Sequence, residues 1–198
     1  MSLDYKRVPF EQKIASVRDF STFKPTRQCQ SPSLARAYIP VSVPKGWYYL
    51  GPLATSDTVT NQQGLIVKPL DDKALADVVD WEFVAPNNGV EPPAPYSSWK
   101  GVAPDGYVVV GHFFVNGPKK PSAAQTAGIK AIRNDLVQGL RGQRLIWLGR
   151  QPRSVVTIWD VFAVPTLYIG TGAFVSSGSD DPEGTILPVL RLIFNPDS

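Results

Sequence analysis

The chain has 198 residues, with 20 basic and 17 acidic side chains and a formal net charge of +3, too small an excess for a surface that tracks nucleic-acid phosphates. A single cysteine, Cys29, excludes an internal disulfide framework and a cysteine-based metal cluster. Nineteen prolines and sixteen glycines, mixed with Val, Ile and Tyr, indicate many short strands joined by tight turns, and therefore an all-β protein.

The amino-terminal residues carry charges where a secretory signal needs an apolar run. The longest apolar stretch, 108–115, is far below the roughly 20 residues of a membrane span. We therefore expect no transmembrane segment, and a protein that is cytoplasmic or released without a classical signal peptide. Within residues 1–24, the stretch around Phe20 and Phe23 predicts a strand.

Three segments share one pattern of strand, tight turn, strand and closing glycine. They are IPVSVPKGWYYLG from Ile39, WKGVAPDGYVVVG from Trp99 and WDVFAVPTLYIG from Trp159. The closing glycines, Gly51, Gly111 and Gly170, stand 60 and 59 residues apart. A period that regular indicates a repeat architecture.

The repeats extend approximately over 35–90, 95–152 and 153–194 in a single β domain, 1–198. The first two each continue into a strand that contains a tryptophan, Trp81 or Trp147, whereas the third ends without one. We expect the strand around Phe20 and Phe23 to pair with the end of the third repeat and close the structure, because an open sheet edge is a site of aggregation. Residues 129–133 predict a strand, followed by a turn of helix.

The middle repeat resembles a known family. Its motifs are Trp99, the turn APDGYVVVG that follows it, KAIRNDL from Lys130 and LIW from Leu145, and the resemblance is to the vacuolar-protein-sorting sixty-two family of fungi, plants and bacteria. It covers roughly residues 35–193 and implies a repeated β architecture more than an activity.

Three units with a period of about 60 residues favour a β-prism-like fold of three pseudo-equivalent four-stranded units. A β-sandwich or a β-trefoil is the alternative. Trp99 and Trp159 occupy matching positions in the repeats, as do Trp81 and Trp147, and all four are expected to be structural.

Alternation along the second strand of each hairpin separates two faces. The better candidates for the core are Tyr48, Leu50, Val108, Val110, Leu167 and Ile169. The other face would direct aromatic rings with polar handles toward solvent or the loops, where they can stack on a sugar; it carries Trp47, Tyr49, Tyr107, Val109 and Tyr168.

Candidate ligand-binding residues occur in the turns and in one acidic loop. The turns contribute Trp47, Asp105 and Tyr107, and the loop SSGSDDPEG contributes Gly178, Asp180 and Asp181. Carboxylates beside free backbone amides can accept and donate hydrogen bonds to hydroxyl groups, although the same residue types are also common in plain solvated turns. The third turn, 163–166, has no glycine or following large aromatic residue, so the three sites should differ.

No catalytic or metal-binding motif is recognisable. His112 is the only histidine and has no nucleophile motif around it, and no Cys/His set has zinc-site spacing. The adjacent pairs Asp71-Asp72 and Asp180-Asp181 are poorly suited to the opposed carboxyl groups of glycoside hydrolysis. We therefore expect no enzyme activity, no cofactor and no metal.

The sequence favours a non-catalytic recognition module that binds carbohydrate or lipid head groups. Its partners would be glycans or lipid head groups, with peripheral membrane contact and no nucleic acid. Two alternatives remain open: a membrane-targeting or accessory component of a pore-forming toxin, and an intracellular adaptor-binding module in vacuolar sorting.

Overall fold

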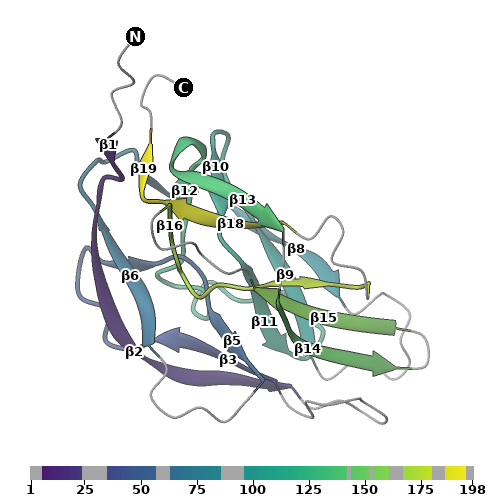
Figure 1. Ribbon diagram of the computed structural model, residues 1–198. Coiled ribbons are helices and arrows are strands. Elements are labelled where there is room, and N and C mark those ends of the chain that lie inside the picture. The colour runs from purple at the N-terminus through teal and green to yellow at the C-terminus, as the bar shows by residue number, and fades with distance from the viewer. Residues whose placement is uncertain are drawn as a thin grey trace.

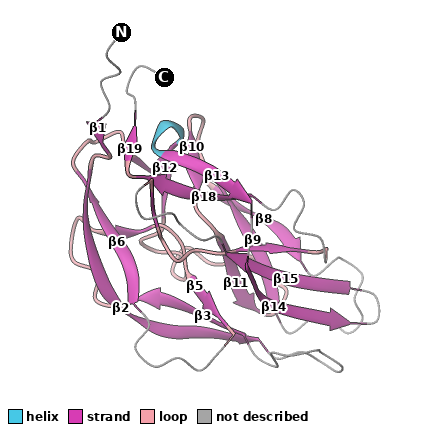
Figure 2. Cartoon of the chain, viewed as in Figure 1, coloured by secondary structure: helices cyan, strands magenta, loops and turns pink. Residues whose placement is uncertain are grey.

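The structure is a computed structural model that describes residues 6–23, 35–56, 63–85, 96–141, 144–151, 154–160, 167–179 and 186–194. The regular structure among these residues is strand, apart from one turn of 3₁₀ helix at Asn134–Leu136 (Figure 2). The all-β prediction is confirmed. The helical turn directly follows the strand Lys130–Arg133, as the sequence predicted.

The strands recur in the same order in each repeat. The first repeat contains β3 (Ala35–Pro40), β4 (Tyr48–Tyr49), β5 (Leu53–Thr55), β6 (Gln63–Pro69), β7 (Leu75–Asp77) and β8 (Asp80–Ala85). The second contains β9 (Tyr96–Val102), β10 (Tyr107–Val109), β11 (His112–Asn116), β12 (Lys130–Arg133), β13 (Val137–Arg141) and β14 (Arg144–Gln151). The third contains β15 (Ser154–Asp160), β16 (Tyr168–Ile169), β17 (Val175–Ser177), β18 (Ile186–Arg191) and β19 (Ile193–Phe194), and the amino-terminal strands are β1 (Lys6–Arg7) and β2 (Phe10–Phe23).

Each repeat is completed by the strands that precede it. The second repeat forms two three-stranded sheets, β10-β12-β7 and β11-β9-β8, whose third strands are the tail of the first repeat. The third repeat forms β16-β18-β13 and β17-β15-β14, whose third strands are the tail of the second. The expected four-stranded units are therefore pairs of three-stranded antiparallel sheets that exchange strands along the chain.

β2 provides the third strands for the first repeat. Its first half pairs with β6 and its second half pairs with β3, giving the strand order β4-β6-β2-β3-β5. The expectation that the strand around Phe20 and Phe23 pairs with the end of the third repeat is thus wrong, since Phe23 lies opposite Ala35. The reason is that the last strands of the first and second repeats each pair with the repeat that follows. No repeat precedes the first one to supply such strands, and β2 takes their place.

The two ends of the described chain also meet. β1 pairs with β19, with Lys6 opposite Phe194 and Arg7 opposite Ile193, and the two strands lie side by side in Figure 1.

The buried hydrophobic residues form three clusters, two of which join all three repeats. One cluster joins the sheets that contain β6, β12 and β18, through residues that include Val67, Ile132 and Leu190. The other joins the sheets that contain β3, β11 and β14, through residues that include Ala37, Phe114 and Trp147. Burial of the tryptophans is confirmed, because Trp81, Trp99, Trp147 and Trp159 are all less than 10% exposed.

The hairpins meet at the centre of the molecule. A Cβ added to Gly51 would overlap the carbonyl oxygen of Val110 and lie 3.2 Å from the Cβ of Ala173. A Cβ added to Gly111 would lie 2.9 Å from the same Cβ of Ala173. The third repeat therefore brings Ala173 to this centre, and not Gly170, because β16 and β17 are joined by a longer connection than β10 and β11.

Candidate binding site

The two predicted turns have the same geometry. Trp47 N–H donates to the Pro44 carbonyl at 3.0 Å, and Tyr107 N–H donates to the Pro104 carbonyl at 3.1 Å. Gly46 and Gly106 both have φ of 81°, a left-handed conformation that favours glycine. Asp105 is exposed beside the second turn. Residues 163–166 of the third turn lie outside the described residues.

The aromatic residues after these turns are less exposed to solvent than the alternation along the strands predicted. Trp47 and Tyr107 are half-buried and pack against a cluster that includes Trp81 and Phe113. Tyr49, on the face expected to point toward solvent, is 3% exposed. Both faces of the hairpin strands are covered, because the central core packs on one face and this cluster packs on the other.

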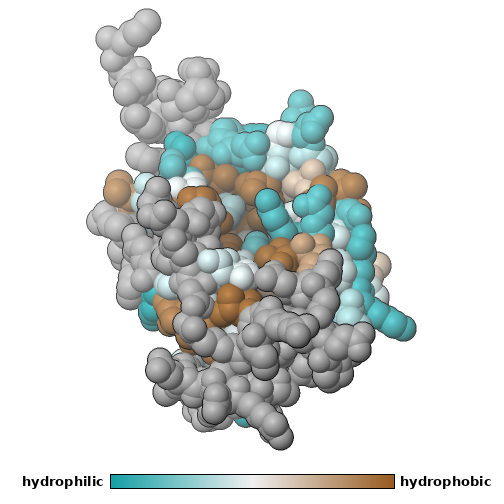
Figure 3. All heavy atoms as spheres, turned by 90° about the vertical axis from the view of Figure 1, so that its right-hand side faces the viewer, coloured by the Kyte–Doolittle hydropathy of each residue, from teal (hydrophilic) through white to brown (hydrophobic). Residues whose placement is uncertain are grey.

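The other face of these strands, which was expected to form the core, contains one exposed side chain. Leu167, expected in the core, is 54% exposed. Figure 3 shows hydrophobic and hydrophilic side chains interspersed on the face that it presents.

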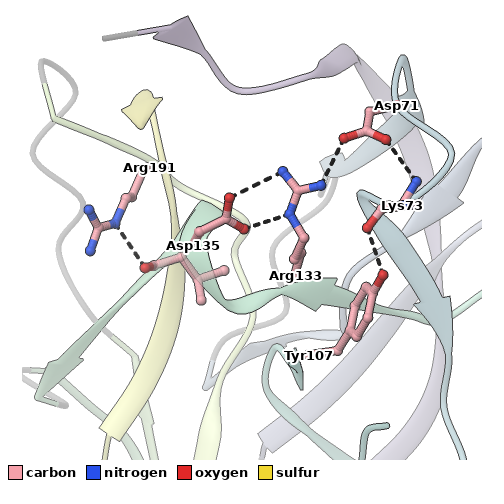
Figure 4. Close-up of polar contacts among 7 residues, drawn as sticks. Asp71, Lys73, Tyr107, Arg133, Asp135 and Arg191 are labelled. Atoms are coloured by element: carbon pink, nitrogen blue, oxygen red, sulfur yellow. Dashed lines mark hydrogen bonds and ion pairs between the residues drawn. The ribbon is translucent and has the colours of Figure 1, made fainter. Parts of the chain in front are cut away.

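A closed polar network fixes Tyr107 and the end of β12 (Figure 4). The Arg133 guanidinium donates to Asp135 at 2.7 and 3.1 Å and to Asp71 at 2.8 Å. The other Asp71 oxygen accepts the Lys73 N–H at 2.8 Å, and Tyr107 Oη donates to the Lys73 carbonyl at 2.8 Å. These side chains satisfy one another, so the network holds the turn before β7 against β12 and β10.

The charges of this network stabilise each other. The Lys73 backbone N–H and the Arg133 guanidinium hold the pKa of Asp71 below its ordinary value. The hydrogen bonds that Arg133 donates to the carboxylates of Asp135 and Asp71 raise the pKa of Arg133 above its ordinary value. Sequence reasoning missed this network because Asp71 and Arg133 are far apart in the chain, although Arg133 and Asp135 both belong to the KAIRNDL motif.

The third repeat has an aromatic residue at the corresponding place after all. Tyr168 lies opposite Arg191 in the pairing of β16 with β18, as Tyr107 lies opposite Arg133 in the pairing of β10 with β12. Arg191 donates to the Val137 carbonyl and to Gln138 Oε1, both at 2.9 Å. The sequence comparison placed Tyr168 at the position of Val109, because it aligned the repeats on Gly170, whereas the register places it at the position of Tyr107.

The acidic loop and the turns are not brought together by the described residues. Gly178 follows β17 in the sheet β17-β15-β14, where Thr157 Oγ1 donates to the Ser179 carbonyl at 2.8 Å. Trp47 directly precedes β4 and Tyr107 begins β10, and both strands belong to other sheets. Asp180 and Asp181 lie outside the described residues.

His112 joins the second repeat to the third. Its backbone N–H donates to the Phe174 carbonyl at 2.8 Å, and its Nδ1 accepts the Ser176 N–H at 3.0 Å and lies 2.9 Å from Ser176 Oγ. The hydroxyls of Ser98 and Ser176 hydrogen-bond to each other. Burial, with a smaller effect of Lys100, lowers the pKa of His112 to about 3, so the imidazole is neutral. Both serines are buried, and these hydrogen bonds connect β11 to β17.

A pocket opens between the first and third repeats. It has a volume of about 550 Å³ and is lined by Gln12, Lys13, Leu53, Gly64, Leu65, Gly170, Thr171 and Gly172. Thr171 Oγ1 accepts the Ala173 N–H at 3.2 Å, which leaves its own proton available as a donor. The lining therefore combines an ammonium group, an amide, a hydroxyl and two leucine side chains. None of the sequence-predicted site residues belongs to it.

The fold and the pocket define an all-β protein made of three strand-exchanging repeats, with a polar pocket at one junction between repeats. The sequence profile described as "Vacuolar protein sorting-associated protein 62" matches residues 11–186. The chain belongs to this family, and the resemblance noted in the sequence is confirmed.

One solved structure extends this comparison. The crystal structure of GNIP1Aa from Chromobacterium piscinae is similar to the chain with a TM-score of 0.69 and 15% sequence identity. The match covers 94% of this chain and 36% of that one, so the chain spans about a third of the length of GNIP1Aa. At this identity the likeness shows a shared fold. No curated protein matches the sequence.

No helix among the described residues has the length and hydrophobicity needed to span a lipid bilayer.

Proposed function

We propose that the chain is a non-catalytic recognition module that binds carbohydrate or lipid head groups in the pocket between its first and third repeats. The observation that carries this proposal is the pocket of about 550 Å³ and its mixed lining. Binding sites for small ligands are typically concave, with apolar walls and a few placed polar groups.

The lining suits hydroxylated ligands. Lys13 supplies ammonium donors, Thr171 a hydroxyl donor, and Gln12 both a donor and an acceptor. Leu53 and Leu65 supply apolar surface for the C–H groups of a sugar or a head group. Lys13 and Gln12 are exposed and make no hydrogen bond with another described side chain, so both are available to a ligand.

The test combines a glycan array with liposome flotation on the full chain. Wild type should bind glycans or vesicles, and Gln12→Trp should lose that binding because the indole fills the mouth of the pocket. Glu82→Trp places the same ring at an exposed strand position in another sheet and should bind like wild type. Failure of wild type to bind either surface, or full binding by Gln12→Trp, would refute the proposal.

A second role is favoured by the comparison with GNIP1Aa. Because the shared fold is about a third of that longer chain, a domain of this kind can serve as one module of a larger protein. Membrane targeting within such an assembly, away from the pocket, predicts binding to vesicles that Gln12→Trp leaves intact, whereas head-group binding in the pocket predicts that Gln12→Trp abolishes it.

A further inference from the structure

The pocket exists because two side chains are missing at one junction between repeats. At the junction of the first and second repeats, Tyr49 of β4 lies against Ile129, and its N–H donates to the Gly128 carbonyl at 3.1 Å. The strand registers place Gly170 where Tyr49 stands and Gly64 where Ile129 stands. Tyr49 and Ile129 are both buried, whereas Gly170 and Gly64 line the pocket.

The wall of the pocket is also polar where its counterpart is apolar. Gln12 and Lys13 of β2 occupy the register positions that Leu75 and Ala76 occupy in β7. One junction of the fold is therefore filled with hydrophobic side chains, while the other is an open pocket with an amide and an ammonium group in its wall.

The charge of this wall is unbalanced. Lys13 makes no ion pair with another described residue, and the neighbouring Glu11 carboxylate is engaged by Lys68 at 2.9 Å. None of the described residues that line the pocket carries a carboxylate. A ligand with an anionic group would receive a charge-assisted hydrogen bond from Lys13, and such bonds are roughly twice as strong as neutral ones.

We propose that the ligand of this pocket is an acidic saccharide, whose carboxylate is held by Lys13 and whose hydroxyls are held by Gln12 and Thr171. This inference rests on the proposed recognition function and names its ligand class. A saccharide is favoured over a membrane surface because the exposed large hydrophobic side chains of the described residues all lie outside the lining; they are Leu70, Val79, Phe83, Leu145, Leu167 and Ile186.

The experiment uses matched probes that differ only in the acidic group. Methyl β-D-glucuronide and methyl β-D-glucoside are titrated into the full chain by calorimetry, beside an array of acidic glycans and their neutral counterparts. The glucuronide should bind about tenfold more tightly than the glucoside, the size expected for one charge-assisted hydrogen bond. Lys13→Gln should remove this preference and Lys13→Arg should retain it.

Lys119→Gln is the control, since it removes one exposed positive charge that lies outside the pocket lining. It should keep the wild-type preference.

Equal affinity for the two sugars, or a preference that survives Lys13→Gln, would overturn the acidic specificity. If neutral sugars bind and Gln12→Trp abolishes that binding, the recognition function stands without the acidic specificity. If only vesicles bind, a head group replaces the saccharide. If nothing binds, both proposals fail.

Discussion

At the scale of single residues, two glycines with the same backbone conformation have different surroundings. Gly106 has φ of 81°, and a Cβ added to it would have no heavy atom within 4 Å. Gly111 has φ of 78°, and its added Cβ would lie 2.9 Å from the Cβ of Ala173 and from the carbonyl oxygen of Phe174. The first glycine is required by conformation alone, and the second also by close packing at the centre.

This contrast predicts unequal costs for the same substitution. Gly106→Ala should lower the free energy of unfolding by about 1–2 kcal/mol, the usual cost of a left-handed conformation for a residue with a Cβ. Gly111→Ala should cost a further ~1–3 kcal/mol, because overpacking is added to that strain. Urea denaturation of the two variants measures the difference, and equal losses would contradict the central packing described above.

His112 predicts a loss of stability in mild acid. Its pKa is lowered to about 3 in the folded chain, whereas an unfolded histidine titrates near about 6.5. As the pH falls, the imidazole of His112 therefore binds a proton in the unfolded chain before it does so in the folded chain. The stabilisation is complete above about pH 6.5 and is lost as the pH falls toward 3, by up to about 1.4 kcal/mol per pH unit.

Denaturation of wild type and His112→Gln between pH 7 and 5 isolates this effect, because most carboxylates stay ionised in that window. The glutamine can still accept the Ser176 N–H but does not titrate. Wild type should lose stability across the window and the variant should not. Parallel curves for the two proteins would show that His112 is not held neutral.

At the scale of elements, the Arg133 network is the main polar link between β7, β10 and β12. Both of its carboxylates are partly buried, since the side chains of Asp71 and Asp135 are 39% and 24% exposed. The pair of Lys120 with Asp80 offers a contrast, with side chains that are 49% and 55% exposed.

Arg133→Met should lower the free energy of unfolding by about 1–3 kcal/mol, because Asp71 and Asp135 lose their shared partner while remaining partly desolvated. Lys120→Gln should cost clearly less than Arg133→Met, because exposed ion pairs contribute little to stability. Thermal denaturation of the two variants compares them, and a larger effect of Lys120→Gln would show that the network is not structural.

Much of the local arrangement of strands and turns could be predicted from the sequence. The hairpin turns, the strand and helical turn around Arg133 and the buried tryptophans all follow from local patterns. The pairing of β2 with β6 and β3 could not, because the pattern of one repeat does not say which repeat its last strand joins. The position of Tyr168 was missed for a similar reason, since the longer connection after β16 shifts Gly170 away from the place of Gly111.

At the scale of the whole molecule, the fold is a ring of repeats in which each tail completes its successor and β2 completes the first. Deleting residues 1–23 removes β2, the central strand of the five-stranded sheet β4-β6-β2-β3-β5. We expect loss of cooperative unfolding and aggregation through the exposed edges. A synthetic peptide of residues 6–23 added to the truncated chain should restore a folded monomer. A truncated protein that is as stable and monodisperse as the full chain would contradict this arrangement.

The pocket itself could not be predicted from sequence patterns. Gly64 and Gly170 create it through the absence of side chains, and Lys13 reaches it from a strand that belongs to no repeat. The predicted residues Trp47, Asp105 and Tyr107 were chosen because aromatic and acidic groups suit sugar binding. The rings of Trp47 and Tyr107, however, are partly used in packing, and the Tyr107 hydroxyl is used in the network with Lys73.

The central claim is that a ligand occupies the junction between the first and third repeats. It is tested most directly by mapping backbone amide chemical shifts of the ¹⁵N-labelled full chain during titration with methyl β-D-glucuronide. The largest shifts should fall on Lys13, Gly64, Gly170 and Thr171. Shifts confined to Gly106 and Tyr107, or to Gly178, would contradict it and would return the binding site to the turns or to the acidic loop.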